Sequence, residues 1–333
     1  MENDNFQNIT NPRDGYDLPV YGIYNNTFYG IHIPALICIV TSFTCAIIAI
    51  VLSFMNKSRR TFFTAWSKSD RFIVYLAVCD GLFNTAHFTD HMHVVIVRNH
   101  VYPRQLCEFY GFTLAEFITA QNLMVNVIAV NAFMLMYFDR NINFGKYDWR
   151  LLTWTFGAPF VGASIAGALG QLGPNGAFCH FDAVKGKIAG LFFTTVTILI
   201  ILLMNSILFA LILRKIRALA HATRHSHSSL SSSMRTSVRA AQSMSLFVAA
   251  FFIQWWAMAL YGTWNIFTDD VPQPLFHLVT IFVNLGGILN LCVYLIIRRR
   301  LIGRWSSKRS NTTIKSTNAA TPKSTESKRE SRI

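Results

Sequence analysis

At 333 residues the chain is long enough for two soluble domains, but its composition excludes that arrangement. Hydrophobic residues make up 52% of the sequence and charged residues only 14%, well below the share of charge in a soluble domain. The net charge of +14 would suggest a nucleic-acid partner for a soluble protein, but the positions of the charges favour membrane topology, so no nucleic acid is expected.

Apolar segments taken in chain order predict an all-α membrane protein, a bundle of seven transmembrane helices. Each segment is long enough to cross a hydrocarbon core of roughly 30 Å at about 1.5 Å per residue. The expected parts are an extracellular tail (1–32), the transmembrane domain (33–297), a short amphipathic helix (298–305) and a disordered cytoplasmic tail (306–333). The predicted spans are 33–55, 72–97, 107–138, 150–172, 187–213, 243–267 and 275–297.

The Lys and Arg residues predict the orientation, because cytoplasmic segments are enriched in both. With the N-terminus outside, the inner segments are 56–71, 139–150, 214–242 and 298–333. They hold 5, 3, 6 and 11 of the 30 Lys and Arg residues. This asymmetry favours an odd number of spans, with the N-terminus outside and the C-terminus inside.

Two segments outside the spans carry signals for modification. Asn8-Ile-Thr and Asn25-Asn-Thr are sequons in the outer tail and predict glycosylation there. The basic, serine-rich loop at 214–242 and the Ser/Thr/Lys-rich tail from Ser306 are typical of disordered, phosphorylatable segments. A solvated basic flank that fixes the topology accounts for both segments as well as a dedicated kinase site does.

The cysteines divide into two groups by position. Cys107 and Cys179 lie at segment ends, and the other four lie inside apolar segments, where a thiol behaves as a small hydrophobe. Cys107 and Cys179 are therefore the only pair placed to form a disulfide, provided that both ends face an oxidising compartment.

Asp80 and Asn290 lie at matching depths in the second and seventh predicted spans. They are 8 and 7 residues from the inner span ends, roughly 10–12 Å above the cytoplasmic boundary. A carboxylate in lipid is costly and normally faces the bundle interior with a polar partner, so we expect the two to meet through water or a cation such as Na⁺. Tyr294 follows Asn290 by four residues on the same helix face. The alternative is an unpaired Asp80 in a water-lined crevice, without a role in switching.

Three short motifs carry a resemblance to a known family. They are Leu76-Ala-Val-Cys-Asp80, Asn290-Leu-Cys-Val-Tyr294 and Phe252-Ile-Gln-Trp255-Trp256-Ala-Met258. In order and spacing these motifs resemble LAxxD, NPxxY and FxxCWxP of the rhodopsin-like (class A) G-protein-coupled receptors. Cys107 and Cys179 match the family's disulfide, and Trp154 stands where its tryptophan in span four would fall.

The resemblance covers about residues 33–305 and implies a function. It implies a receptor without catalytic activity that passes the signal of an extracellular small molecule or peptide to a heterotrimeric G protein. Arrestin and kinases would act on the Ser/Thr-rich tail, and membrane lipid would surround the bundle. Trp256 would form the pocket floor and shift when ligand binds, with Trp255 and Phe252 beside it. Alternatively, one tryptophan faces lipid and the other the core.

The sequence departs from the family at two prolines. Leu291 and Met258 stand where the family has proline, which opens a helix by removing a backbone hydrogen bond. Gly286-Gly287 can loosen the seventh span instead.

Two alignments are open at the inner end of the third span. Asp139-Arg140 resembles the family's DRY motif by residue type. It lies 32 residues from Cys107, about 48 Å of helix, which exceeds the full bilayer of roughly 40–45 Å. Ile128-Ala-Val-Asn131-Ala-Phe133 matches the register without the charges, and we favour it. Asp139 and Arg140 then lie in the inner loop, as part of the partner-binding surface or as ordinary positive-inside charge.

Other features narrow the subfamily and the ligand. The chain resembles the slime-mould cyclic-AMP-receptor-like group in two features. It lacks the charged triplet, and Gly111 follows shortly after Cys107. Leu114 stands where aminergic receptors have Asp, which disfavours an amine ligand. Residues 275–297 contain no Lys, which excludes retinal linkage by that route.

His87, Asp90 and His91 share one face of the second span by their spacing. They could bind a polar ligand, sense pH or hold a metal, but a hydrated mouth near the headgroups is favoured. With His277 they would supply Zn²⁺ ligands for a seven-helix membrane metal-hydrolase, the second functional alternative. A transporter or channel is the third functional alternative. It is less favoured, because the sequence shows no internal repeat. Neither a metal nor any cofactor other than Na⁺ near Asp80 is expected.

Overall fold

The structure is a computed structural model that describes residues 11–55, 57–225, 232–268 and 271–299. By their contacts, residues Met1–Val293 form one compact unit and Tyr294–Ile333 a second. Asn8, nearly all of the expected amphipathic helix and the whole tail from Ser306 lie outside the described residues.

The described residues are predominantly helical, which confirms the predicted all-α class. Six helices among them are long and apolar enough to cross a membrane, or up to seven if one bent pair counts as a span. That pair consists of Gln273–Val283 and Gly286–Arg299, which meet at an angle of 45°. The labelled helices are α1 (Phe28–Met55), α2 (Phe62–Ala65), α3 (Lys68–Val97), α4 (Arg104–Phe138), α5 (Trp149–Leu152), α6 (Ala158–Ala168), α7 (Lys187–Gly190), α8 (Thr197–His225), α9 (Ser232–Phe267) and α10 (Gln273–Val283).

Short irregular turns connect or interrupt these helices. Single π-helical turns join α5 to α6 and α7 to α8, so each pair continues as one apolar helix of the membrane-spanning set. The irregular elements are η1 (Gly15–Asp17), η2 (Arg59–Thr61), η3 (Lys146–Asp148), η4 (Thr153–Gly157) and η5 (Leu191–Val196).

Several predicted boundaries differ from the observed helix ends. The expected loop at 214–242 is helical over most of its length, because α8 runs to His225 and α9 begins at Ser232. The basic segment after residue 213 is rich in Ala, Leu, Lys and Arg, which are strong helix formers. The fourth span ends at Ala168 rather than 172, where Gly170 with a φ of 64° turns the chain out of the helix.

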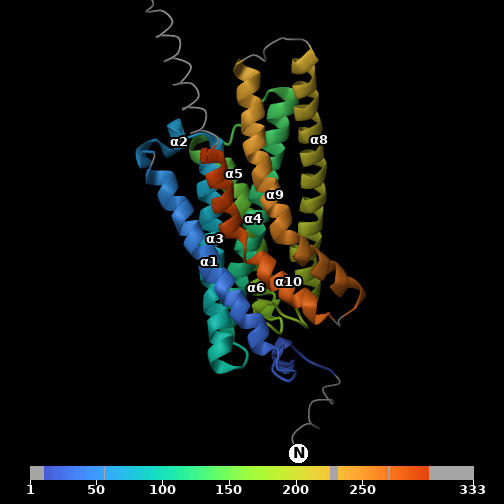
Figure 1. The fold of residues 1–333 in the computed structure, drawn as a ribbon. Helices are drawn as coiled ribbons and strands as arrows, with labels where there is room; N and C mark the ends of the chain where they lie inside the picture. Colours follow the sequence, from blue (N-terminus) through green and yellow to red (C-terminus); the bar gives the residue numbers. More distant parts are fainter. Residues whose placement is uncertain (1–10, 56, 226–231, 269–270, 300–333) are drawn as a thin grey trace, which may run out of the picture. The chain divides into compact units, whose positions relative to one another are not determined.

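Helix α4 occupies the centre of the 1–293 unit. It contacts α3, α6, α8, α9 and both strands, while α1 packs on α3 and α10 (Figure 1). Small residues allow close helix approach: Ala46 and Ala49 of α1 pack against Ala77 of α3. Large apolar side chains stay exposed, among them Ile37 at 62% and Leu203 at 64%, as expected of helices that face lipid.

A small hairpin lies on the N-terminal part of α4. Strand β1 (Leu172–Pro174) pairs antiparallel with β2 (Cys179–Phe181), with Leu172 opposite Phe181. A Cβ atom at Gly111 would lie 2.5 Å from the carbonyl oxygen of His180, so only glycine lets α4 approach the strand this closely. We call this side of the 1–293 unit the hairpin end, and the side with α2 the opposite end.

Candidate functional site

Asp80 of α3 is the centre of a buried hydrogen-bond network. Its side chain accepts from Gln121 Nε2 of α4 and from Asn290 Nδ2 of the Gly286–Arg299 helix, each at 2.6 Å. Gln254 of α9 donates to Gln121 Oε1 at 3.2 Å and to the carbonyl of Val283 at 3.0 Å. We call Asp80, Gln121, Gln254 and Asn290 the polar seam. It links side chains from four helices at one point.

The contact between Asp80 and Asn290 is direct, whereas water or a cation was expected between them. Amide N–H groups from Asn290 and Gln121 point at the two carboxylate oxygens. Each oxygen of the carboxylate keeps a further lone pair, so the expected Na⁺ near Asp80 stays a prediction.

Two glycines permit the seam to form. A Cβ atom at Gly286 would lie 2.3 Å from Asp80 Oδ1 and 2.8 Å from Gln254 Nε2. A Cβ atom at Gly287 would lie 2.1 Å from the carbonyl of Ser42 in α1. The helix break falls just before them, at residues 284–285. The main role of Gly286-Gly287 is thus close approach to α3 and α1 rather than loosening of the helix.

Tyr294 belongs to the second unit, Tyr294–Ile333. Its hydroxyl accepts a hydrogen bond from Arg298 Nε at 3.0 Å, and the Arg298 guanidinium lies 5.6 Å from the ring centroid. Its predicted part in the network around Asp80 stays a prediction.

The two adjacent tryptophans of α9 differ strongly in burial. Trp255 is 1% exposed and packs on Phe251, with a ring separation of 6.5 Å. Trp256 is 40% exposed and meets Phe282 edge to face. Phe252 is half-buried. Trp256 is not among the residues that line the cavity described below. Its predicted place at a pocket floor and the alternative of one core and one lipid-facing tryptophan both stay predictions.

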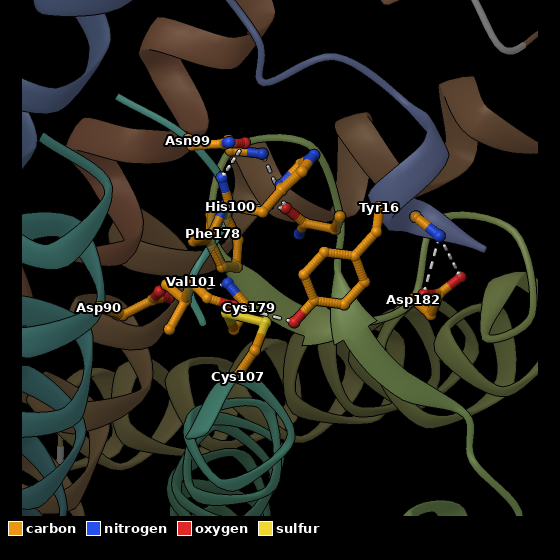
Figure 2. The surroundings of a disulfide bond; sticks show 12 residues. Tyr16, Asp90, Asn99, His100, Val101, Cys107, Phe178, Cys179 and Asp182 are labelled. Atoms are coloured by element: carbon orange, nitrogen blue, oxygen red, sulfur yellow. Dashed lines mark hydrogen bonds between the residues drawn. A yellow bond between two sulfur atoms is a disulfide. The ribbon is translucent and has the colours of Figure 1, made fainter. Parts of the chain in front are cut away.

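The predicted disulfide between Cys107 and Cys179 is present and anchors β2 to α4. Beside it, the Asp90 carboxylate of α3 accepts a hydrogen bond from the Cys179 amide at 2.8 Å (Figure 2). On the other side of the strand pair, both oxygens of Asp182 accept from the Gly15 amide. The N-terminal segment and the ends of α3 and α4 are thus tied to one hairpin.

Further contacts fix the N-terminal segment at the hairpin end. Tyr16 donates its hydroxyl proton to the carbonyl of Val101 at 3.0 Å (Figure 2). Asp14 pairs with Arg104 at 2.9 Å and Lys185 at 3.3 Å. Burial opposes the charge on Asp14, but hydrogen bonds from Lys185 and Arg104 outweigh it and lower the pKa of the carboxyl below its usual value.

A cavity of about 30 Å³ lies inside the bundle beneath the hairpin. Since about 10–15 Å³ of such volume holds one water, it has room for a few water molecules. Helices α3, α4, α9 and α10 and strand β2 supply its walls. The lining residues are Phe83, His87, His91, Leu114, Ile118, Phe178, His180, Met258, Val279, Thr280, Val283 and Asn284.

Buried histidines extend from this cavity to α1. His32 Nδ1 lies 2.7 Å from His91 Nδ1, and His91 Nε2 lies 3.0 Å from His87 Nε2. His87 Nδ1 lies 3.0 Å from Asn284 Oδ1. All four residues are at most 4% exposed. We call His32, His91, His87 and Asn284 the histidine chain.

The candidate metal ligands of the second span do not converge. Asp90 turns to the Cys179 amide, while His87 and His91 bond to each other. His277 pairs with Gln273 on its own helix. Within the described ranges no group of three or more His, Cys, Asp or Glu side chains is arranged to hold a metal ion. The structure thus gives the metal-hydrolase alternative no support.

The predicted partner-facing residues lie at the opposite end. Asn131 is fully buried and its Oδ1 accepts from the Ile142 amide at 3.1 Å. Asp139 follows the last residue of α4 and accepts a hydrogen bond from Ser237 of α9 at 3.2 Å. Arg140 is exposed in the loop. Asn131 thus holds the loop against α4, and Asp139 links α4 to α9.

Asn25 is exposed between η1 and α1, so its sequon is accessible. Its Oδ1 accepts from the Thr27 hydroxyl at 2.6 Å. Its glycosylation stays a prediction.

Sequence reasoning missed Gln254, His32, His180 and Asn284 as site residues. A signal existed for two of them. His32 is the only histidine, acid, lysine or arginine within α1, and Gln254 interrupts an apolar stretch of α9. A lone polar residue in an apolar span is costly unless it faces a partner inside the bundle.

No protein-family model matches this sequence, and no curated protein matches it. The fold and the site define a helical membrane protein with one disulfide among the described residues, a polar seam and a small histidine-lined cavity.

Proposed function

We propose that the chain is a seven-helix receptor of the plasma membrane that signals to a heterotrimeric G protein. The observation that carries this proposal is the polar seam, a hydrogen-bond network around one carboxylate that links side chains from four helices. A buried, shared hydrogen-bond network has few alternative arrangements, so it suits a bundle that switches between two states.

The proposed topology has seven spans, with the bent pair as the seventh and the N-terminus outside. The Cys107–Cys179 disulfide at the hairpin end suits an oxidising exterior. The cationic segments between spans would then face the cytosol. In this arrangement the cavity lies on the ligand side of the seam, and Asp139 lies on the side of the G protein.

The proposed mechanism runs from the cavity to the opposite end. A ligand that contacts the cavity walls differently in two bundle states would shift their populations. The seam lies between the cavity and the α4–α9 link of Asp139 with Ser237. A shift of the seventh helix would exchange the hydrogen bonds of Asp80 and release α9, which opens a crevice for the G protein.

The test is nucleotide exchange on purified G proteins by the full chain in lipid nanodiscs. We expect exchange above that of empty nanodiscs for at least one G-protein class. Asp80→Asn should change the basal rate several-fold, because it alters the shared acceptor. Gly81→Ala is the matched control: no atom lies within 4 Å of the added methyl group, and its rate should equal wild type.

Absence of exchange for every G-protein class, across a ligand panel and in both variants, would overturn the receptor proposal, provided that the protein unfolds cooperatively. Equal effects of Asp80→Asn and Gly81→Ala would instead contradict the role of the seam.

A further inference from the structure

Asn284 fixes the position of every proton in the histidine chain. Its Nδ2 donates to the Thr280 carbonyl at 2.7 Å, so its Oδ1 faces His87 and accepts. His87 therefore carries its proton on Nδ1 and accepts at Nε2. His91 must then donate from Nε2 and accept at Nδ1, and His32 donates from Nδ1. One set of neutral tautomers satisfies all three contacts.

The chain ends at a nitrogen that can take a proton. His32 Nε2 is buried and has no hydrogen-bond partner among the described residues. Because His32 donates from Nδ1, its Nε2 carries the lone pair. The ring packs against Phe28 at a centroid distance of 4.5 Å. This is an unsatisfied acceptor at one end of a relay of imidazoles.

An added proton can travel along the chain with all atoms balanced. It first forms an N–H bond at His32 Nε2. The Nδ1–H bond of His32 then breaks as an N–H bond forms at His91 Nδ1. The Nε2–H bond of His91 breaks as one forms at His87 Nε2. His32 and His91 end neutral and His87 ends as imidazolium, with a proton on each nitrogen.

The relay stops at Asn284, because an amide oxygen accepts a hydrogen bond without passing a proton on. The charge is thus stored on His87, beside the break at residues 284–285. A hydrogen bond from a charged donor is roughly twice as strong as a neutral one, so protonation tightens the contact of α3 with this break. The Phe178 ring of the hairpin lies 5.1 Å from the His87 ring and can stabilise the cation.

We propose that the histidine chain is a proton-binding site and that a proton is the ligand of this cavity. The cavity of about 30 Å³ is too small for an organic ligand, and its polar wall is mostly imidazole. The bound proton would join three parts of the 1–293 unit: α1 through His32, the break through Asn284 and the hairpin through Phe178. A signalling role for the proton rests on the proposed receptor function, whereas proton binding itself does not.

Other titratable groups surround the chain and must be separated from it. Asp90 of α3 accepts from the Cys179 amide. Glu116 of α4 lies between the cavity-lining residues of that helix. His180 of β2 faces the same cavity, and His277 lies on α10. Helix α1 also carries Tyr29, and α9 carries Tyr261. A readout for each ring is therefore needed.

The experiment uses the full chain in lipid nanodiscs with ¹⁵N-labelled histidine, observed by NMR between pH 8 and pH 5. Ring nitrogens report the tautomer directly, and single His→Gln variants assign the signals. At high pH we expect Nδ1–H on His32 and His87 and Nε2–H on His91. On acidification the three rings should change together with one shared midpoint, because they share one proton.

His91→Phe keeps a ring in place and removes the relay, so His32 and His87 should then titrate with separate midpoints. His277→Gln is the control and should leave the shared midpoint unchanged. A different tautomer pattern, three independent titrations or rings that stay neutral to pH 5 in the wild-type chain would each overturn the proposal, even if His91→Phe does not fold. G-protein activation plays no part in this readout, so a failure of the receptor proposal is a separate result.

Discussion

Asp80 accepts two amide hydrogen bonds in a buried site, and its closest substitute cannot do so. In Asp80→Asn one acceptor becomes an NH₂ group that faces the donor of Gln121 or of Asn290. A buried unsatisfied donor costs about 1–3 kcal/mol, so we expect a loss of stability of this size. Denaturant unfolding in detergent measures it. Asp17→Asn is the control, because its partner Arg13 is 91% exposed, and it should stay within about 0.5 kcal/mol of wild type. Equal losses would contradict the role of the seam.

His180 makes the stability depend on pH. Burial, with His87 nearby, lowers the pKa of His180 from 6.5 to about 3. The unfolded chain therefore binds a proton at mildly acid pH that the folded chain does not. Stability is intact above pH 6.5 and falls as the pH drops below it, by up to about 1.4 kcal/mol per pH unit.

In His180→Phe the unfolded chain can no longer bind a proton at this position. The loss of stability between pH 6.5 and pH 5 should therefore be smaller than in wild type. Unfolding measured at several pH values gives the slope. His277→Phe, at a half-buried position, is the control and should keep the wild-type slope. An unchanged slope in His180→Phe would show that His180 is not the group responsible.

Depth along a helix was enough to predict that Asp80 and Asn290 belong together, because residue count gives height in the bilayer. The rotation of a helix about its own axis is harder to predict from the sequence. The sequence did not assign Gln121 to Asp80, and it did not show which of Trp255 and Trp256 is the buried one. Which face of a helix points into the bundle depends on packing by all its neighbours, and nearly every face of these helices is apolar.

The break between α10 and the helix that follows positions the polar seam. In Gly286→Ala the added methyl carbon would lie 2.3 Å from Asp80 Oδ1, so the Asp80 side chain or the Gly286–Arg299 helix must shift. We expect a loss of about 1–3 kcal/mol from the hydrogen bonds of the seam.

Gly81→Ala is the matched control within α3, next to Asp80. Its new methyl group meets nothing within 4 Å, and replacing a helical glycine stabilises by about 0.5–1 kcal/mol. Thermal unfolding of both variants in the same detergent measures the difference. If Gly286→Ala were as stable as Gly81→Ala, the glycine would serve flexibility rather than close approach.

The helices themselves were predictable, but several of their ends were not. Hydropathy identifies the lipid-crossing part and is silent on a helix that continues into water. The basic segments of α8 and α9 extend these helices beyond the apolar part, because their residues favour helix without being apolar. Hydropathy therefore could not predict where the two helices end. The hairpin at 172–181 was also missed, because its short strands carry no alternating pattern and depend on the Cys107–Cys179 bond and α4 for support.

For the whole molecule, the number of membrane spans has a direct test. An odd number of spans puts the N-terminal segment and the C-terminal tail on opposite sides of the membrane. An even number puts them on the same side. Whether the bent pair crosses completely therefore decides the side of the tail.

The test introduces single cysteines at Tyr24, Thr64 and Lys315. Reaction of each cysteine with a membrane-impermeant maleimide on intact cells shows whether that position lies outside the cell. Tyr24 is 69% exposed before α1, and Thr64 is exposed in α2 at the opposite end of the helices (Figure 1). We expect Tyr24→Cys to react on intact cells, and Thr64→Cys and Lys315→Cys only after permeabilisation, because cationic segments stay in the cytosol. The unmodified chain is the control, since its free cysteines lie in membrane-spanning helices. Reaction of both Tyr24→Cys and Lys315→Cys on intact cells would mean an even number of spans and would remove the basis for a seven-helix receptor.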